Sequence, residues 1–441
     1  MKIVLVVVDT LRADHLGCYG YFRNTSPTID QLAREGVLFL DAHATAIATG
    51  PAFTSIVTGL SPIHHGFYVT PFNIPNLVNF NDAIPTLAEL IPKEKGYTTV
   101  AFDNLMSFLC PMKQLVRGFE YYINVSCRSN ERGADLRGGR INSRLLPWIK
   151  QHAREDFFLF VHYWEPHTPY SQPEDYRHLF HHIPGNLSDL KVEKAPAGYS
   201  YVPGWGKVGE LWESEKGDPP MSLDLYDGEI RYLDDLLKEV IETLKSMKIL
   251  EETVIIVTSD HGEQLGQHGM YGHQGLNESV ICIPLILWNP ERFPQGKVIR
   301  GYVQQADIAP TILDLMGAEQ FPHFDGESLI PLIMGEGNAR EEIFVEDEEQ
   351  RALLQGKWKY IRHYELGKDV LYNLQEDPVE IIDYSREYPQ QLQVMSSRLH
   401  GWIKKNLNGS IDPLPEAIRR WRTEWKNFLG EPLPKEWTIF P

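Results

Sequence analysis

The sequence lacks several features that would place it in a specialised class of protein. It has four cysteines among 441 residues and no C-x-x-C pair, which argues against a disulfide-rich fold and suits a reducing compartment. It has no apolar run near the roughly 20 residues that a membrane span requires, and no internal repeat. The apolar run Ile3–Val8 is too short for the core of a signal peptide. We therefore expect a cytoplasmic protein without a membrane anchor.

Positive charge is also scarce. The chain has 42 Lys and Arg residues against 60 Asp and Glu residues, a net charge of -18. This excess repels polyanions at long range, which argues against general binding to nucleic acid or to an anionic membrane. A small anionic ester held by a local metal ion remains compatible with it. The length and the hydrophobic content of 42% indicate a globular protein with one large and one small domain, and they leave a homo-oligomer open.

Short apolar runs alternate with helical patterns along much of the chain. The runs contain few polar residues, which is typical of strands buried on both faces: Ile3–Val8, Phe157–Val161, Val254–Val257 and Ile281–Leu287. One helix is opened by Ser26-Pro27 and closed by Gly36, and another carries an apolar stripe from Ile230 to Leu244. Strands that alternate with helices predict an α/β fold with a mainly parallel central sheet flanked by helices.

The pattern changes after about residue 335. Short runs at 343–345, 352–361 and 370–374 suit antiparallel strands joined by tight turns, and a helix is expected from about Pro389 to Ile403. We therefore predict two domains, 1–335 and 336–441, the second a small α+β domain with an antiparallel sheet. Residues 171–220 are rich in Pro, Gly, Trp and Tyr without a clear period, which predicts an insertion that walls or covers a site.

Two carboxylates directly follow predicted strands. Asp9 ends the first strand, and Asp260 with His261 follows the strand Val254–Val257. Reactive groups gather at the carboxyl ends of strands in such sheets, and Asp and His can offer oxygen and nitrogen ligands to one cation. Each residue alone could equally be a helix cap or a surface side chain. Their convergence at one sheet edge predicts a site for a divalent metal ion.

Thr49 stands just before a short apolar helix that is expected over residues 51–58. A threonine in this place is most often a helix cap. If it meets Asp9, Asp260 and His261 at the same edge, it adds a third oxygen, and the ion lowers the pKa of its hydroxyl. The helix dipole and Pro51, which has no N–H to lose, also favour negative charge there. The sequence therefore predicts Thr49 as a metal ligand and a nucleophile.

Four separated segments resemble the sulfatase family within the alkaline phosphatase superfamily. They are VDTLRADHLGCYG at 8–20, TGP at 49–51 with TG at 58–59, EPHTPY at 165–170 and SDHG at 259–262, and later landmarks lie at 308–313 and 373–378. The resemblance runs from the first strand to about residue 405. It implies an alkaline phosphatase-like fold and a metal-dependent ester hydrolase.

The sequence departs from the sulfatase pattern at four positions. Thr49 stands where sulfatases have a Cys or Ser that is oxidised to formylglycine, and threonine cannot yield that aldehyde. Phe53, Thr10 and His273 stand where the pattern has an arginine, a second strand-end acid and a lysine. Fewer fixed cations argue for a substrate with little charge at the reacting centre. A phosphodiester or a phosphonate monoester fits this better than a phosphomonoester dianion, and threonine nucleophiles of the wider superfamily point the same way.

Histidines are the candidates for the general acid that protonates the leaving oxygen. By the resemblance, His167 contacts the substrate or assists the leaving group, and His273 suits a substrate contact, a general acid or a ligand for a second metal. His162 and His268 are weaker candidates. The resulting hypothesis is in-line attack by Thr49 on phosphorus, protonation of the leaving oxygen by His167 or His273, and release of the bound phosphoryl group by water.

The metal and two other functions stay open at this point. Three oxygen donors and one nitrogen donor suit Mn or Ca, or Zn if further histidines complete a second site. The first alternative is a sulfuric ester hydrolase that uses Thr49 without formylglycine. The second is a pseudoenzyme that binds an anionic partner without turning it over. Transfer of the bound group to an acceptor alcohol is also compatible with the sequence.

Overall fold

The computed structural model describes residues 1–68, 80–103, 113–125, 137–168, 170–180, 223–364, 366–415, 419 and 423. The predicted insertion at 171–220 lies mostly outside the described residues, as do Cys110 and Cys127. Within the described part, no helix is long and apolar enough to cross a membrane.

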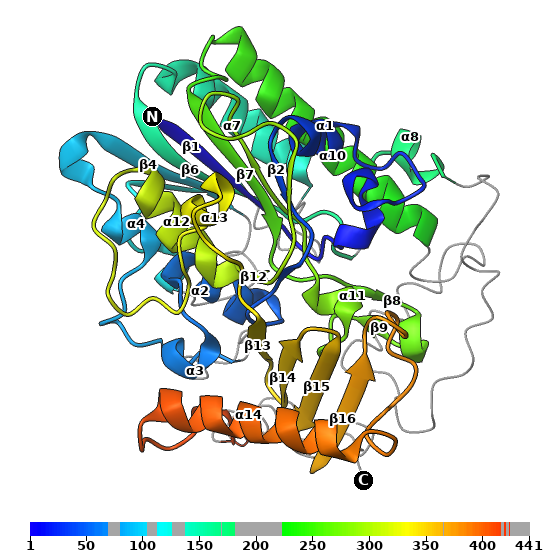
Figure 1. Ribbon diagram of the computed structural model, residues 1–441. Coiled ribbons are helices and arrows are strands. Elements are labelled where there is room, and N and C mark those ends of the chain that lie inside the picture. Colours follow the sequence, from blue (N-terminus) through cyan, green and yellow to red (C-terminus); the bar gives the residue numbers. More distant parts are fainter. Residues whose placement is uncertain are drawn as a thin grey trace.

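An eight-stranded sheet forms the centre of the larger part of the molecule (Figure 1). In spatial order its strands are β11 (Lys297–Ile299), β2 (Val37–Phe39), β10 (Leu285–Trp288), β7 (Thr253–Ser259), β1 (Lys2–Val8), β6 (Asp156–Tyr163), β4 (Tyr97–Asp103) and β5 (Tyr121–Asn124). Neighbouring strands are parallel except at β10, which runs antiparallel to both β7 and β2. The predicted mainly parallel sheet is therefore confirmed.

One predicted strand is wrong in its extent. The run Ile281–Leu287 is divided, because residues up to Ile281 form the short helix α11 (Glu278–Ile281) and β10 begins only at Leu285. Pro284 stands between them and has no N–H for a strand ladder. The strands β4 and β5 are absent from the predicted set, although β4 is rich in the β-branched and aromatic residues that favour strands.

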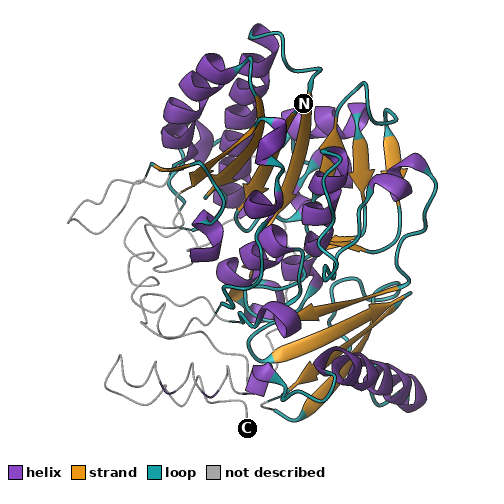
Figure 2. Cartoon of the chain, turned by 90° about the vertical axis from the view of Figure 1, so that its left-hand side faces the viewer, coloured by secondary structure: helices purple, strands orange, loops and turns teal. Residues whose placement is uncertain are grey.

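Helices cover both faces of this sheet (Figure 2). Successive side chains of a strand point to opposite faces, so β1 contributes Ile3, Leu5 and Val7 to one core and three valines, Val4, Val6 and Val8, to the other. The first core includes residues of α2 (Thr49–Thr58), α12 (Ile308–Leu315) and α13 (Ile330–Met334). The second includes residues of α1 (Pro27–Glu35), α7 (Gly138–His152) and α10 (Leu223–Ser246).

The predicted helices at Ser26–Gly36 and along 230–244 are present as α1 and α10. Ser26 precedes α1 as expected, but it makes no capping hydrogen bond there. Instead Asp234 of α10 accepts hydrogen bonds from Thr28 N and Ile29 N, each at 2.9 Å. The cap of α1 is therefore a tertiary contact that ties two helices together on one face of the sheet.

A four-stranded antiparallel sheet follows near the carboxyl end. Its strands lie in the order β13 (Glu342–Glu346), β14 (Gln350–Gln355), β15 (Trp358–His363) and β16 (Lys368–Asn373). One face packs on the long helix α14 (Pro389–Leu407), which crosses the lower part of Figure 1, and the other packs on residues of α11. The predicted antiparallel sheet with its helix is confirmed, whereas the domain boundary at residue 335 stays a prediction.

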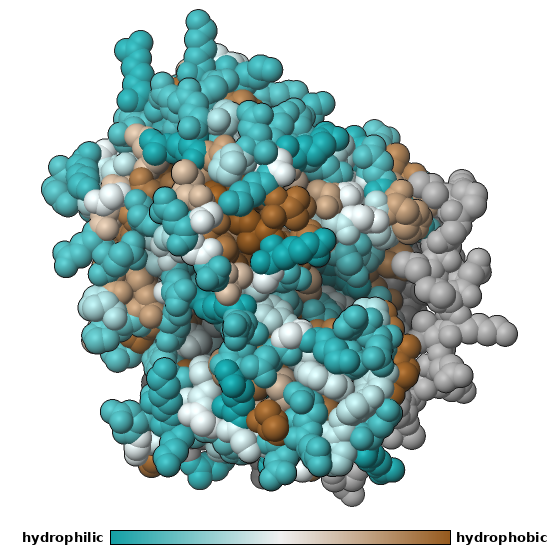
Figure 3. Space-filling model, viewed as in Figure 1, coloured by the Kyte–Doolittle hydropathy of each residue, from teal (hydrophilic) through white to brown (hydrophobic). Residues whose placement is uncertain are grey.

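Short elements complete the described part of the chain: α3 (Pro62–His65), α4 (Leu87–Leu90), α6 (Lys113–Val116), α8 (Glu174–Arg177), the parallel pair β3 (Ala42–His43) and β12 (Val303–Gln304), and the antiparallel pair β8 (Gln264–Leu265) and β9 (Tyr271–Gly272). The face of the molecule in Figure 3 is largely hydrophilic, with a hydrophobic area in its upper half.

Candidate functional site

Four neighbouring parallel strands bring acidic and imidazole side chains to one edge of the large sheet. Strands β1 and β7 are paired in register, so Asp9 and Asp260, each one residue beyond its strand, lie side by side. His162 of β6 and Asp103 at the end of β4 continue the row. By the alternation of side chains, all four belong to the set that faces α2.

Asp9, Asp260 and His261 form a group that we call the strand-end cluster. Each offers one ligand atom, and these atoms lie within 4.8 Å of one another. All three side chains are fully buried. Within the described part of the chain, both carboxylate oxygens of Asp9, Oδ2 of Asp260 and Nε2 of His261 have no hydrogen-bond partner. Buried acceptors without donors are costly, and one divalent cation would satisfy all of them, so these residues fit a metal ion.

Further contacts orient these ligand atoms. Oδ1 of Asp260 accepts hydrogen bonds from Thr10 N at 3.0 Å and His261 N at 2.7 Å, which leaves Oδ2 for the cluster. His261 Nδ1 donates to the carbonyl of Gly262 at 2.9 Å, and burial lowers the pKa of His261 to about 3. The neutral ring therefore presents the lone pair of Nε2. Burial, followed by the neighbouring Asp9, raises the pKa of Asp260.

The backbone beside two predicted ligands adopts a left-handed conformation. Thr10, next to Asp9, has φ 56°, and Ala48, next to Thr49, has φ 65°. Residues with a Cβ rarely adopt this conformation, and a β-branched residue does so least readily. Thr10 is held in place by Tyr226, whose hydroxyl donates to the Thr10 carbonyl at 2.7 Å. Strained residues of this kind concentrate at functional sites.

α2 begins at Thr49, two residues before the expected start at Pro51, and Ala48 occupies the N-cap position. The Thr49 residue is buried, with 7% of its surface exposed. One turn later on the same helix face, the Phe53 ring packs edge-on against His162, with ring centroids 4.8 Å apart. His162 Nε2 in turn lies 3.7 Å from Asp9 Oδ2. These contacts place Phe53, one turn along α2 from Thr49, beside the imidazole that neighbours Asp9.

The loop that leads into α2 is tied to the same edge by Gln305, in the short 3₁₀ helix η6 (Gln305–Asp307). The Gln305 side chain accepts a hydrogen bond from Thr45 N at 3.0 Å. It donates to the carbonyl of Ser259 at 3.1 Å and also to that of Asp260. Gln305 therefore links the approach to Thr49 with the end of β7, a role that no local sequence pattern indicates.

Asp103 is a further residue of this edge that is absent from the predicted set. It accepts a hydrogen bond from His162 Nδ1 at 2.7 Å and another from the Tyr122 hydroxyl. His162 Nε2 is buried without a hydrogen-bond partner. Burial opposes protonation of His162, but Asp103 and then Asp9 raise its pKa to about 10. The signal that could have found Asp103 is an acid at the end of a β-branched run, as at Asp9.

The two predicted acid histidines lie next to the strand-end cluster. The His273 ring lies 4.5 Å from the His261 ring and 5.4 Å from the His167 ring, centroid to centroid. His273 Nδ1 lies 3.5 Å from Glu263 Oε1, and although burial opposes it, this carboxylate raises the pKa of His273. His167 Nδ1 donates to the carbonyl of Thr168. The structure thus brings His167, His261 and His273 into one row.

His268 is not part of this row. It lies in the 3₁₀ helix η5 (Gln267–Gly269), with φ 54°. Its electrostatic neighbours are Asp377 and Lys359 of the carboxyl-terminal part, and burial lowers its pKa. Its described contacts therefore give it no role at the strand-end cluster.

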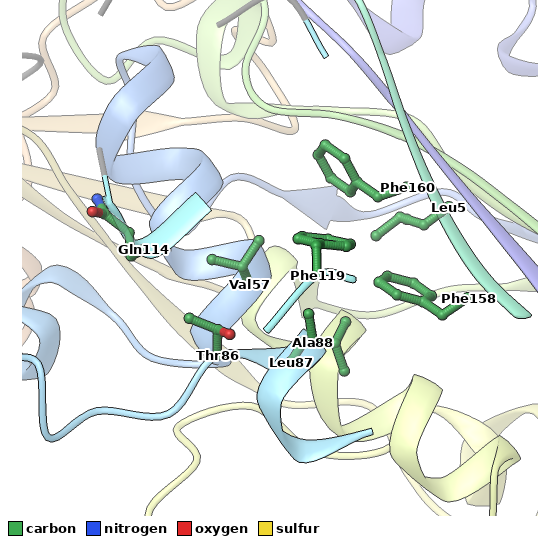
Figure 4. Close-up of a pocket in the computed structure, with 9 residues that line it drawn as sticks. All are labelled: Leu5, Val57, Thr86, Leu87, Ala88, Gln114, Phe119, Phe158 and Phe160. Atoms are coloured by element: carbon green, nitrogen blue, oxygen red, sulfur yellow. The ribbon is translucent and has the colours of Figure 1, made fainter. Parts of the chain in front are cut away.

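A small cavity in the apolar core is distinct from the strand-end cluster (Figure 4). Its volume accessible to water is about 10 Å³, enough for one water molecule. It is a packing gap and not a substrate pocket, because its lining is almost entirely apolar: Leu5, Val57, Thr86, Leu87, Ala88, Gln114, Phe119, Phe158 and Phe160.

Family models cover most of the chain. Residues 2–318 match the model described as Sulfatase, and residues 266–406 match the model described as N-sulphoglucosamine sulphohydrolase, C-terminal. Among curated proteins, a sulfatase of Formosa agariphila is 25% identical over 432 residues, which cover 88% of this chain and 83% of that protein. The multifunctional alkaline phosphatase superfamily protein PehA of Trinickia caryophylli is 25% identical over 447 residues, 86% of this chain and 83% of that protein.

Solved structures share the fold. The phosphonate monoester hydrolase of Agrobacterium radiobacter superposes with a TM-score of 0.72 at 20% identity, over 92% of this chain and 96% of that one. BT4656, solved with its substrate D-glucosamine-2-N,6-O-disulfate, gives a TM-score of 0.75 at 18% identity, over 93% of this chain and 99% of that one. The same architecture therefore occurs in proteins named for phosphonate and for sulfate esters.

Proposed function

Because the chain belongs to the sulfatase family, we propose that it is a metal-dependent hydrolase of a small phosphodiester or phosphonate monoester. The observation that carries the proposal is the strand-end cluster, where Asp9, Asp260 and His261 leave buried acceptor atoms without hydrogen-bond partners among the residues that the structure describes. A divalent cation held by these residues, Mn, Ca or Zn, supplies positive charge that lowers the pKa of a nearby hydroxyl and offsets negative charge at the reacting centre.

Thr49 is the nucleophile in this proposal. The Thr49 hydroxyl releases its proton to solvent, its oxygen attacks phosphorus in line with the leaving oxygen, and the bond from phosphorus to the leaving oxygen breaks. His167 or His273 gives a proton to the leaving oxygen, since both rings lie beside the cluster. Water then cleaves the bond between phosphorus and Thr49 and restores the hydroxyl. The strained residue Ala48 and the contact between Phe53 and His162 support this placement of Thr49.

The charge around the cluster supports a substrate with a single negative charge. Among the described residues, no lysine or arginine forms an ion pair with Asp9 or Asp260. Arg12 follows Asp9 closely in sequence, but Asp14 and the carbonyl of Glu263 already hold its guanidinium. Among the described residues, the fixed positive charge that contacts Asp9 is the imidazole of His162, and without a paired lysine or arginine the site suits a diester or a phosphonate monoester better than a phosphomonoester dianion.

A sulfuric ester is the second candidate substrate. A sulfate monoester also carries one negative charge, and the relatives include proteins named as sulfatases. It ranks below the phosphorus esters because Thr49 cannot form the aldehyde that sulfatases use.

The test is a comparison of four p-nitrophenyl substrates with the purified protein: a phosphonate monoester, a phosphate diester, a phosphate monoester and a sulfate, each with Mn²⁺, Ca²⁺ or Zn²⁺. We expect metal-dependent turnover, with the highest kcat/KM for the phosphonate monoester or the diester. Thr49→Ala should lower kcat/KM by about 10³-fold or more, because the nucleophile is lost.

Thr58→Ala is the matched control, because Thr58 lies in the same helix and its buried hydroxyl donates to the carbonyl of Thr54. It should leave kcat/KM close to the wild-type value. Faster hydrolysis of the sulfate would overturn the substrate assignment in favour of a sulfatase. The absence of metal-dependent turnover on all four esters would favour a binding protein, and full activity of Thr49→Ala would remove Thr49 from the mechanism.

A further inference from the structure

A second group of potential metal ligands lies outside the strand-end cluster, where β3 meets α11. We call His43, Glu278 and Cys282 the junction cluster. One ligand atom from each lies within 4.8 Å of the other two. His43 ends β3 and forms an isolated antiparallel bridge with Cys282. Glu278 begins α11, and Cys282 directly follows this helix and donates its N–H to the Glu278 carbonyl at 2.9 Å. The backbone therefore holds the three side chains together.

The contacts of His43 define which ring nitrogen faces this cluster. Its Nδ1 lies 3.1 Å from the carbonyl of Asp41, which can only accept, so Nδ1 carries the hydrogen. Nε2 then faces Glu278 Oε2 at 3.2 Å. In the neutral ring two acceptors face each other there. The contact therefore requires a cation between them, either a proton or a metal ion.

The charges around Glu278 favour an additional cation. Lys359 of β15 is fully buried and lies 2.8 Å from Glu278 Oε1 and 2.7 Å from Glu380 Oε1. Two carboxylates and one ammonium leave an excess of one negative charge, and a thiolate at Cys282 would add a second. A divalent cation bound to Glu278, Cys282 and neutral His43 makes the whole group neutral, which favours its burial.

The donor set selects the class of metal. Imidazole, thiolate and carboxylate together suit zinc-class ions, whereas Ca²⁺ and Mg²⁺ prefer oxygen ligands alone. The Glu278 side chain is 22% exposed, which provides an entry path and a position for a water ligand. We propose that the junction cluster is a second metal site, in which His43 Nε2, Glu278 Oε2 and Cys282 Sγ bind a zinc-class divalent ion.

Binding would replace the S–H bond of Cys282 by a sulfur–metal bond and release the proton to solvent. The site joins β3 to α11, and through Lys359 it adjoins the four-stranded sheet. It would therefore hold together parts of the chain that are far apart in sequence. This proposal does not depend on Thr49 or on hydrolysis at the strand-end cluster.

Cobalt(II) tests the junction cluster because its spectrum reports thiolate coordination directly. Protein treated with a chelator is titrated with Co²⁺, and the thiolate-to-cobalt charge-transfer absorption in the near ultraviolet is followed. We expect the band in the wild type and in Asp260→Asn, because the strand-end cluster contains no thiol. Cys282→Ser should abolish the band, and His43→Gln should weaken cobalt binding by about 10-fold or more.

Cys18→Ser is the matched control, because Cys18 is the other free cysteine of the described residues, and it should keep the band. Circular dichroism verifies that each variant is folded. If Cys282→Ser does not fold, protection of Cys282 from alkylation by Zn²⁺ in the wild type provides an equivalent measurement. Absence of the band in the wild type, or its persistence in Cys282→Ser, would overturn the proposal and leave an ion-pair network around Lys359.

Discussion

The strand-end cluster and the junction cluster contain similar side chains but differ in how their charge is compensated. In the first, Asp9 and Asp260 face each other with buried oxygens that have no donor among the described residues. In the second, Lys359 lies 2.8 Å from Glu278. Uncompensated buried acceptors cost free energy, so the first cluster is destabilising until a cation binds, whereas Lys359 already offsets part of the negative charge of the second. The stability of such a cluster without a metal ion therefore depends more on the hydrogen-bond donors and cations around it than on the residue types within it.

Removal of the lysine from the junction cluster should have the largest effect on stability. Lys359→Met keeps the length of the side chain but leaves Glu278 and Glu380 without their cation. We expect the free energy of unfolding to fall by about 3–5 kcal/mol, because the two carboxylates stay buried next to each other. Urea denaturation followed by circular dichroism measures this change.

Lys357→Met is the control for the lysine substitution. Lys357 pairs with Glu376 at 3.7 Å, and both side chains are exposed, so its loss should change the free energy of unfolding by less than about 1 kcal/mol. An equal fall in the free energy of unfolding in the two variants would show that the buried Lys359 contributes no more than an exposed lysine. The contrast between the two clusters would then be wrong.

Neutralisation of the strand-end cluster should act in the opposite direction. Asp260→Asn keeps Oδ1 as the acceptor for its two backbone N–H groups and places an amide N–H where Oδ2 now lies 3.3 Å from His261 Nε2. In the metal-free protein we expect a gain of about 1–3 kcal/mol, because an unpaired acceptor becomes a paired donor. Thermal unfolding with a chelator present measures it.

Addition of Mn²⁺ or Ca²⁺ should reverse the order of the two proteins. Binding to the folded state stabilises the wild type, whereas Asp260→Asn has lost a ligand and gains less. The contrary outcome is that metal-free Asp260→Asn is less stable than the wild type and that added metal does not change the difference. It would mean that groups of the protein itself already pair with the ligand atoms of the cluster.

A buried imidazole outside both clusters should make the stability of the protein depend on pH. His65 accepts a hydrogen bond from Phe67 N at 3.0 Å, and burial lowers its pKa from 6.5 to about 3. Between these values the unfolded chain binds one more proton than the folded protein, so stability falls as the pH falls. His65→Gln should reduce this slope by about 1.4 kcal/mol per pH unit. Urea denaturation at a series of pH values measures the slope.

The neighbouring His64 offers a control of opposite sign. Its hydrogen bond with Asp325 raises its pKa, so its proton stabilises the folded protein at low pH, and this contribution is lost as the pH rises above 6.5 through the raised value. His64→Gln should remove that loss and leave the acid slope of His65 in place. If the fall of stability with falling pH is unchanged in His65→Gln, groups other than His65 cause it.

The strand-end cluster was largely predictable because its signals are local. Unalternating apolar runs mark β1 and β7, and Asp9 and Asp260 stand directly after them. Asp103 was missed because β4 begins with Tyr97 and two threonines and does not form an apolar run. Its neighbour His162 was identified only as a weak candidate, since its partners Asp9 and Asp103 lie on other strands.

The junction cluster could not be predicted in this way. Glu278 and His43 are 235 residues apart, and the short helix that carries Glu278 overlaps the start of a run predicted as a strand. Lys359, which distinguishes this cluster from the other, comes from a third part of the chain.

By itself the sequence determined the mainly parallel sheet, the small antiparallel sheet and the acids at the ends of β1 and β7, because hydrophobic periodicity and strand ends are properties of neighbouring residues. Only the tertiary structure decided that Thr49 starts its helix, that Asp103 holds His162, and which buried acceptors lack a partner. The physical reason is that hydrogen bonding and charge compensation depend on every group within a few ångströms, and the chain brings those groups together only when it folds.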